Sequence, residues 1–242
     1  MASRILIVFE KDLRQYYSKA PVLSWGFLFP LAIIVLLSFS AKAYGEDVVV
    51  PGMFSVALLF SSTSMAQVAV SFEKMNGSLQ RLVYSPLSVD ELLAAKALGG
   101  VLYGVLGSLL AVTAVRLLTG HVILLHTLFF SAAVIIVALN YSLLSTAISL
   151  RFEPVKGVAV LNLARFLMVF LGGMVIPRIL MPGLLQPAAY LFPSLYATEA
   201  LRYSLYNTWD LVDPYTSLIV LSITTAALFM FSRRLLEEVM TP

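Results

Sequence analysis

The residues best suited to chemistry in this chain are polar groups inside apolar stretches. Asn162 and Arg165 are three residues apart within the apolar stretch 157–176, so a helix would place them on one face. An ionisable group at membrane depth is costly and commonly marks the path of a substrate or ion. Arg165 would lie roughly 12 Å into the stretch at 1.5 Å per residue. There it would face a cavity, pair with another subunit, or extend its long side chain to the membrane surface.

A second polar group lies in the apolar stretch 51–70. The four consecutive hydroxyl residues 61–64 are first interpreted as groups that pack helices against one another. Some of them, together with Gln67, would alternatively line a pathway that tolerates polar solutes. The predicted substrate pathway consists of Ser62, Thr63, Gln67, Asn162, Arg165 and Phe166.

The sequence shows no set of residues that would carry a catalytic reaction. It lacks the GxxxxGK[ST] loop that cradles nucleotide phosphates. His121 and His126 are five residues apart, which does not place them on one helical face, and the chain has no cysteine. We therefore predict no catalytic residue, no metal site and no cofactor in this chain.

The composition defines the surroundings of these residues. Of the 242 residues, 60% are hydrophobic and only 12% are charged, against roughly a quarter charged in soluble domains. So few polar side chains cannot coat a globule that is exposed to water. The composition argues against a soluble enzyme, a disordered chain and a nucleic-acid binder, and it indicates that lipid surrounds most of the surface.

The apolar stretches predict an all-α polytopic membrane protein with six transmembrane helices in one domain, residues 1–242. A span needs about 20 apolar residues to cross about 30 Å of hydrocarbon. The predicted spans are residues 22–41, 51–70, 95–118, 127–150, 157–176 and 215–231. The first exceeds the roughly 7–15 residues of a signal-peptide core, so we treat it as a retained span. Gly100 and Gly104 form a GxxxG pair in the third span, which indicates close helix packing without proving a dimer.

The basic residues predict that both chain ends face the cytoplasm. In this orientation eleven lysines and arginines lie inside, four lie outside and Arg165 lies within a span. Such a bias follows the positive-inside rule. The outside residues are Lys42, Arg116, Arg178 and Arg202.

The segment before the first span predicts an amphipathic helix. Within residues 4–19, Ile5, Phe9 and Leu13 recur at helical spacing, and charged residues lie on the other side. This pattern favours a helix lying in the membrane interface. The alternative is an ordinary charged flank of the first span.

The loop 73–91 is the longest predicted cytoplasmic connection. Leu79 and Leu82 at helical spacing would form an apolar ridge on a short helix, either to dock a partner or merely within a solvated link. Pro86 would end that helix. Ser88 and Glu91 match a capping box that opens the next helix.

The segment 177–213 is apolar, yet four prolines interrupt it. Apolar runs of about 10 residues are more often re-entrant or interfacial than spanning. We predict two short helices, near 183–191 and 196–206, that dip into the outer leaflet as a lid; the alternative is a loop lying flat on the membrane. Glu199 and Arg202 would form an i, i+3 pair there.

Two blocks of sequence resemble the permease family of type-2 (ABC-2) ABC transporters. The first is EKMNGSLQRLVYSPLSVDELLAAK at residues 73–96, with an acid followed by Gly-Ser-Leu and Ser-Pro-Leu-Ser. The second joins GGMVIP at 172–177 to LFPSLYATEALRYSLY at 191–206. Lys74 departs from the family pattern, because many members carry a second carboxylate there.

The resemblance implies two permease copies that assemble with two separately encoded ATP-binding subunits, which would hold ATP and Mg. Residues 2–18 would be a connecting helix, residues 73–85 a coupling helix that docks on the ATPase, and residues 177–213 a re-entrant outer segment. The implied coupling residues are Glu73, Lys74, Gly77, Ser78, Leu79, Arg81 and Leu82. The implied gate residues are Pro193, Tyr196, Glu199 and Arg202.

By this resemblance the chain would be a homodimeric efflux permease of the cell (inner or plasma) membrane. It would export an amphipathic molecule, such as a drug, a lipid or a glycan-lipid, by alternating access. The alternatives are a secondary transporter or channel, a haem-exporter-type permease, and a membrane-embedded enzyme or assembly factor. The sequence does not identify the substrate.

Overall fold

The computed structural model describes residues 2–16, 18–81, 87–120, 122–176 and 181–240, and every regular element among them is a helix. Six helices in this part of the chain are long and apolar enough to cross a membrane. Their bounds are Ala20–Tyr44, Glu46–Met75, Val89–Thr119, Thr127–Arg151, Pro154–Leu171 and Pro214–Val239. The predicted all-α fold with six spans is confirmed.

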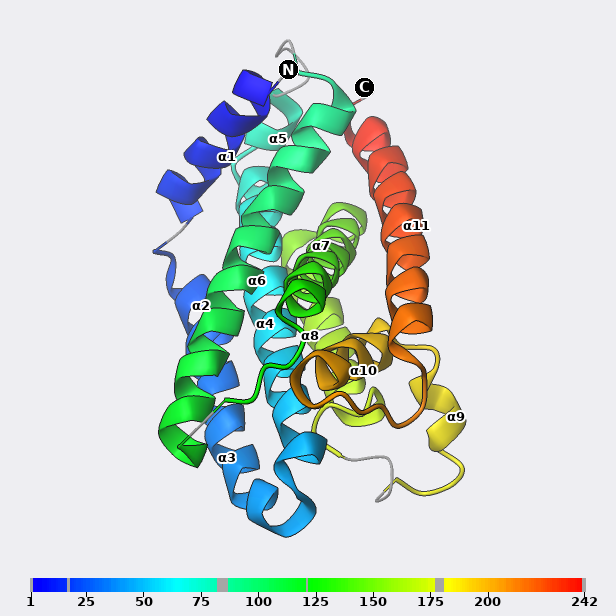
Figure 1. The fold of residues 1–242 in the computed structure, drawn as a ribbon. Helices are drawn as coiled ribbons and strands as arrows, with labels where there is room; N and C mark the ends of the chain where they lie inside the picture. Colours follow the sequence, from blue (N-terminus) through cyan, green and yellow to red (C-terminus); the bar gives the residue numbers. More distant parts are fainter. Residues whose placement is uncertain (1, 17, 82–86, 121, 177–180, 241–242) are drawn as a thin grey trace.

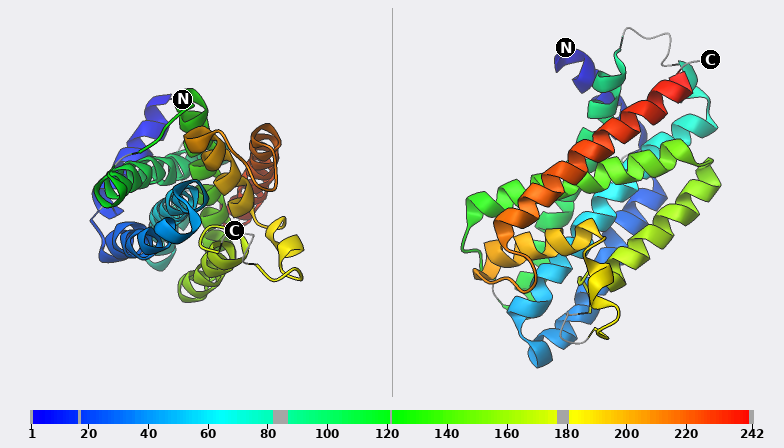
Figure 2. Two further views of the ribbon diagram at one scale, coloured as in Figure 1. Left: turned by 60° about the horizontal axis from the view of Figure 1, so that its bottom comes forward. Right: turned by 90° about the vertical axis from the view of Figure 1, so that its right-hand side faces the viewer.

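The elements follow one another as a bundle of long helices with short connecting helices. In chain order they are α1 (Ala2–Tyr16), α2 (Ala20–Leu23), η1 (Ser24–Leu28), α3 (Phe29–Tyr44), α4 (Glu46–Met75), α5 (Ser78–Arg81), α6 (Val89–Thr119), α7 (Thr127–Arg151), α8 (Pro154–Leu171), α9 (Gln186–Ala189), α10 (Pro193–Tyr206) and α11 (Pro214–Met240). Figure 1 shows both chain ends and α5 at one end of the bundle, which we call the terminal end. The α3–α4 turn, α9 and α10 lie toward the opposite end, the far end, as the right-hand view of Figure 2 also shows.

Helix α4 forms the centre of the bundle. It packs against α3, α6, α7 and α10, and residues 49–71 are all buried. A helix that is buried on every side needs no polar face. The surrounding spans instead expose large apolar side chains such as Phe39, Leu117 and Ile223, which lipid would cover.

Small residues let α6 approach α4 and α7 closely. A Cβ atom on Gly100 would overlap the Ser142 side chain and lie 2.9 Å from the Ser62 carbonyl oxygen. A Cβ atom on Gly104 would lie 2.6 Å from Ala138 Cβ. The predicted close packing at the GxxxG pair is therefore confirmed, and it joins helices of the same chain.

A π-helical segment interrupts the first span. The five residues of η1 lie between α2 and α3, and the Ser61 hydroxyl of α4 donates a hydrogen bond to the Gly26 carbonyl at 2.6 Å. Short π segments inside α-helices often accompany functional sites. Sequence periodicity did not predict this interruption.

The segment between α8 and α11 holds two helices of unequal length. α9 covers four residues where we expected a helix near 183–191, and α10 begins at Pro193, three residues before the expected start. Proline suits the first turn of a helix because it lacks a backbone N–H, so Pro193 starts α10 rather than preceding it. Pro177 and Arg178 lie outside the described residues.

Candidate functional site

Four charged side chains form a closed ring of alternating sign, which we call the charge ring. Lys11 and Asp12 come from α1, Glu73 from α4 and Lys96 from α6. Lys11 Nζ lies 3.0 Å from Asp12 Oδ1 and 2.5 Å from Glu73 Oε1. Lys96 Nζ lies 2.6 Å from Asp12 Oδ2 and 2.6 Å from Glu73 Oε2. The ring has no net charge, which is the condition under which ionised groups are tolerated away from water.

The ring is closed to solvent except at one corner. The side chains of Asp12, Glu73 and Lys96 are at most 3% exposed, whereas that of Lys11 is 37% exposed. Burial alone would lower the pKa of Lys11, but the Asp12 and Glu73 carboxylates outweigh burial and raise it above its ordinary value. Burial, aided by the Glu73 carboxylate, raises the pKa of Tyr16 on α1 to about 12. Both groups therefore keep their protonated forms at neutral pH.

Local structure at the start of α6 places Lys96 in the ring. Ser88 Oγ accepts a hydrogen bond from the Glu91 backbone N–H at 3.2 Å, and the Glu91 carboxylate accepts one from the Ser88 N–H at 2.9 Å. The predicted capping box is thus confirmed. It fixes where α6 begins, so Lys96 follows about two turns later and faces α1 and α4. The ring consequently joins three helices at the terminal end.

Lys74, next to Glu73, braces α4 against a fourth helix. Its ammonium donates hydrogen bonds to the carbonyl oxygens of Ser149, Leu150 and Phe152 at 3.1, 2.9 and 2.7 Å. These carbonyls end α7, where backbone acceptors lack partners within the helix. A carboxylate at this position could not donate these bonds.

Helix α5 is a single turn held close to the bundle. Gly77 has a positive φ of 64°, which lets the chain reverse direction after α4. Leu79 is 1% exposed and packs in an apolar cluster that includes Val8 of α1 and Leu92 of α6. Met75, Asn76, Gln80 and Arg81 are exposed around this turn.

These positions divide the expected docking residues into buried and exposed ones. Glu73 and Leu79 face the interior of the chain, so neither side chain is available for direct contact with a partner. The reason is that α5 lies against α4 and places Leu79 in an apolar cluster shared with α1 and α6. Gly77 and Ser78 are half-buried and Arg81 is exposed. Leu82 lies outside the described residues.

A groove of about 280 Å³ lies along α4, lined also by α2, η1 and α8. Its polar side chains are Gln67 and Ser71 from α4 and Asn162 and Arg165 from α8. The other lining residues are Pro21, Trp25, Val68, Phe72, Met75, Pro154, Val155 and Val158. The groove thus combines a polar end with apolar and aromatic walls, as ligand sites commonly do.

Arg165 is the charged group of this groove. It is 1% exposed, so its side chain does not extend to the membrane surface. Nε donates to Thr63 Oγ1 at 2.9 Å, Nη1 to Asn162 Oδ1 at 2.9 Å, and Nη2 to Ser64 Oγ at 3.0 Å. The guanidinium also lies 5.3 Å from the centre of the Phe60 ring. The sequence interpretation that places Arg165 at a cavity agrees with this geometry.

The predicted pathway residues divide into two sets. Gln67, Asn162 and Arg165 line the groove. Thr63 contacts it only through its hydrogen bond with Arg165. Ser62 instead packs against Gly104 of α6. Phe166 is partly exposed, and its ring makes a T-shaped contact with the Phe29 ring at a centroid distance of 6.1 Å.

The predicted gate residues lie on α10. Pro193 and Tyr196 line a second groove of about 430 Å³, whose other lining residues come mainly from α7 and α11. Glu199 is 2% exposed; its carboxylate accepts a hydrogen bond from the Asp210 N–H at 2.7 Å and lies 3.9 Å from Arg202 Nε. Burial raises the pKa of the Glu199 carboxyl above its ordinary value. These contacts fasten α10 to the following loop.

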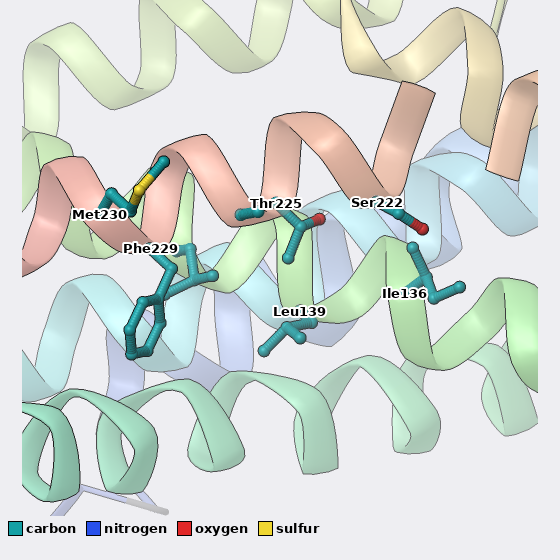
Figure 3. A pocket seen from close by; sticks show the side chains of 8 residues that line it. Ile136, Leu139, Ser222, Thr225, Phe229 and Met230 are labelled. Atoms are coloured by element: carbon teal, nitrogen blue, oxygen red, sulfur yellow. The ribbon is translucent and has the colours of Figure 1, made fainter. Parts of the chain in front are cut away.

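A third groove, of about 500 Å³, lies between α7 and α11 (Figure 3). Its walls include Ile136, Phe229 and Met230. Both hydroxyls in its lining are satisfied within α11, because Ser222 donates to the Leu218 carbonyl at 2.7 Å and Thr225 to the Leu221 carbonyl at 2.6 Å. The lining is therefore mostly apolar, and it suits a lipid chain better than a polar solute.

Sequence reasoning missed three members of the charge ring as site residues. Lys11, Asp12 and Lys96 are each distant in sequence from Glu73, so no local spacing relates them. One signal was available: Lys96 lies in the apolar stretch 95–118, where an isolated charge needs a partner.

Six helices long and apolar enough to cross a membrane indicate a multi-pass membrane protein. A family model described as ABC-2 type transporter matches residues 3–206. The chain therefore belongs to the ABC-2 type transporter family. It is a permease component, not itself an ATPase, and members of this family work with an ABC ATP-binding partner. No curated protein matches the chain.

Proposed function

We propose that this chain is one of two permease subunits of an ATP-driven exporter of amphipathic molecules in the cell membrane. The bias of basic residues supports a cytoplasmic terminal end. The ATP-binding partner that the family implies would then meet α5 and the exposed residues beside it. The two permease copies would enclose the path of the substrate.

The charge ring is the observation that carries this proposal. A force on α5 reaches Glu73 within five residues, because α5 follows the last turn of α4 directly. Glu73 is joined to α1 and α6 by ion pairs, and Lys74 joins the same turn to α7. A displacement at the surface would therefore move several helices together rather than bend one loop.

The central position of α4 gives that movement a consequence. The same helix carries Glu73 at its terminal end and Gln67 and Ser71 in the groove. Closure of the ATPase pair would shift α4 against α8 and change access to the groove. In this mechanism α9 and α10 form a re-entrant lid at the far end, which faces outside.

The test reverses the charge of an exposed α5 residue. Arg81→Glu should lower ATP-dependent efflux of fluorescent amphiphiles by at least about tenfold, since a mismatched charge at an interface costs binding energy. Arg116→Glu is the matched control, because Arg116 is also exposed but ends α6 at the far end. Transport and co-purification of the ATP-binding subunit are measured for both variants. Wild-type transport by Arg81→Glu with the partner bound would contradict the docking assignment.

A further inference from the structure

The guanidinium of Arg165 is buried with neutral partners only. Its three hydrogen-bond acceptors are two hydroxyls and one amide oxygen. Among the residues that the structure describes, no carboxylate forms an ion pair with it. The charge ring shows the contrast, because each of its lysines faces two carboxylates. A buried cation without a counter-charge is costly, and an anion beside it would lower that cost.

The groove leaves donors for such an anion. A guanidinium carries five N–H groups, and three of those of Arg165 are engaged, which leaves one on each Nη. Ser71 lines the same groove, and its buried hydroxyl has no hydrogen-bond partner in the described part of the chain. A carboxylate, sulfate or phosphate accepts several hydrogen bonds at once and would use the two free guanidinium N–H groups.

The other walls of the groove favour a ligand with a large apolar part. Counted along α8, Arg165 lies 11 residues from Pro154, or roughly 16 Å at 1.5 Å per residue, and it is the deepest lining residue of that helix. Between the two lie Val155 and Val158, and Trp25 and Phe72 supply aromatic walls. A small inorganic anion would leave these walls in contact with water, whereas an amphiphile would cover them.

We infer that this groove binds amphipathic anions, with Arg165 as the counter-charge and the apolar walls around the body of the ligand. The inference rests on the proposed function in one respect, namely that the bound molecule is the cargo. It narrows the cargo from amphipathic molecules in general to those with a negatively charged head group. A cationic amphiphile is disfavoured because it would place a second positive charge beside Arg165.

Trp25 provides a reporter inside the groove. The chain has two tryptophans, and the other, Trp209, follows α10 at the far end and is exposed. Trp209→Phe therefore leaves Trp25 as the only tryptophan of the permease chain. The fluorescence of a matched complex that also carries Trp25→Phe is subtracted, which removes the signal of the ATP-binding subunit and of the nanodisc belt protein. The full chain with its ATP-binding subunit, in nanodiscs of phosphatidylcholine, is titrated with dibrominated octadecyl sulfate, whose bromines quench tryptophan on contact. The dibrominated alcohol and the dibrominated trimethylammonium compound have the same chain and carry a neutral or a cationic head group in place of the sulfate.

We expect the sulfate to half-saturate quenching at about tenfold lower concentration than the alcohol, the effect of one or two hydrogen bonds to a charged group. Arg165→Gln should abolish this preference, and Arg165→Lys should keep part of it. Arg116→Gln, which removes one positive charge at the far end, should keep all of it. Dibrominated phosphatidylglycerol, compared with dibrominated phosphatidylcholine, shows whether lipid head groups bind as well as free amphiphiles; either result supports an anion site.

Equal affinities for the sulfate and the alcohol in the wild-type groove would overturn the inference, and this comparison needs no variant to fold. A preference that survives Arg165→Gln would overturn the assignment to Arg165. Binding is measured without ATP, so this test is independent of the Arg81→Glu transport test. If the groove prefers anions but Arg81→Glu does not lower transport, the anion site is supported and the proposed function is contradicted.

Discussion

Glu73 and Lys96 face each other in the interior, and both also pair with residues of α1. We expect Glu73→Gln to lower the free energy of unfolding by about 3 kcal/mol, because it leaves the buried ring with a net positive charge. The double variant Glu73→Gln with Lys96→Gln restores neutrality and should recover part of that loss. Unfolding of the detergent-solubilised chain by denaturant measures each value.

Arg233→Gln is the control for this series. Arg233 pairs with Asp90 at 2.9 Å at the same end of the bundle, but both side chains are about half exposed, so its loss should cost at most about 1 kcal/mol. The single variant Lys96→Gln completes the cycle. If the losses of Glu73→Gln and Lys96→Gln simply add in the double variant, the four charges do not act as one unit, and the ring would not carry force between helices.

At the residue scale, the sequence could identify the polar residues but not their partners. Arg165 stands out because it is charged within an apolar stretch, and its groove position follows from that context. Glu73 stands out for another reason, since it belongs to the motif at residues 73–96. Its burial, however, depends on ion pairs with Lys11 and Lys96, which are 62 and 23 residues away in sequence. Pairings of this kind are set by how helices meet, and spacing within one helix carries no information about them.

Helix α6 packs closely against α4 and α7 at Gly100. We expect Gly100→Ala to lower the free energy of unfolding by about 1–3 kcal/mol, because its new Cβ atom would lie 2.5 Å from Ser142 Cβ in a packed interface. Gly99→Ala is the neighbouring control: its Cβ atom would meet only Met65 at 3.6 Å. That variant should be unchanged or more stable by up to about 1 kcal/mol, since alanine favours a helix over glycine.

Thermal unfolding of both glycine variants, followed by helical circular dichroism, tests the contact. Similar midpoints for Gly99→Ala and Gly100→Ala would show that α6 can move away from α4 and α7 without cost. In that case α6 would not move together with α4 as one unit.

At the element scale, regular patterns were predictable and interruptions were not. Six apolar stretches and the Ser88–Glu91 capping box are local features, and both occur in the structure. The π segment η1 contains Gly26, whose carbonyl accepts a hydrogen bond from Ser61 of α4, a residue far away in sequence. The single turn of α5 depends on how Leu79 packs against neighbouring helices. Tertiary contacts decide both features.

At the scale of the whole molecule, the central helix α4 connects the surface turn α5 with the groove that Arg165 lines. α4 runs from the far end to the charge ring, and it contributes residues to the groove between them. This arrangement suits a permease that receives force at one end and changes access within the membrane. A channel or an ion-driven carrier would not need the exposed surface at α5 to bind an ATPase.

Transport by the reconstituted pair tests whether ATP hydrolysis by the partner drives export. Inside-out proteoliposomes contain the chain with its ATP-binding subunit, either wild-type or with the Walker lysine replaced, and receive anionic, neutral and cationic fluorescent amphiphiles. We expect ATP-dependent accumulation of the anionic amphiphile that is lost with the Walker-defective partner and persists when proton and sodium gradients are collapsed. Accumulation that continues with the defective partner, or that requires an ion gradient, would contradict it.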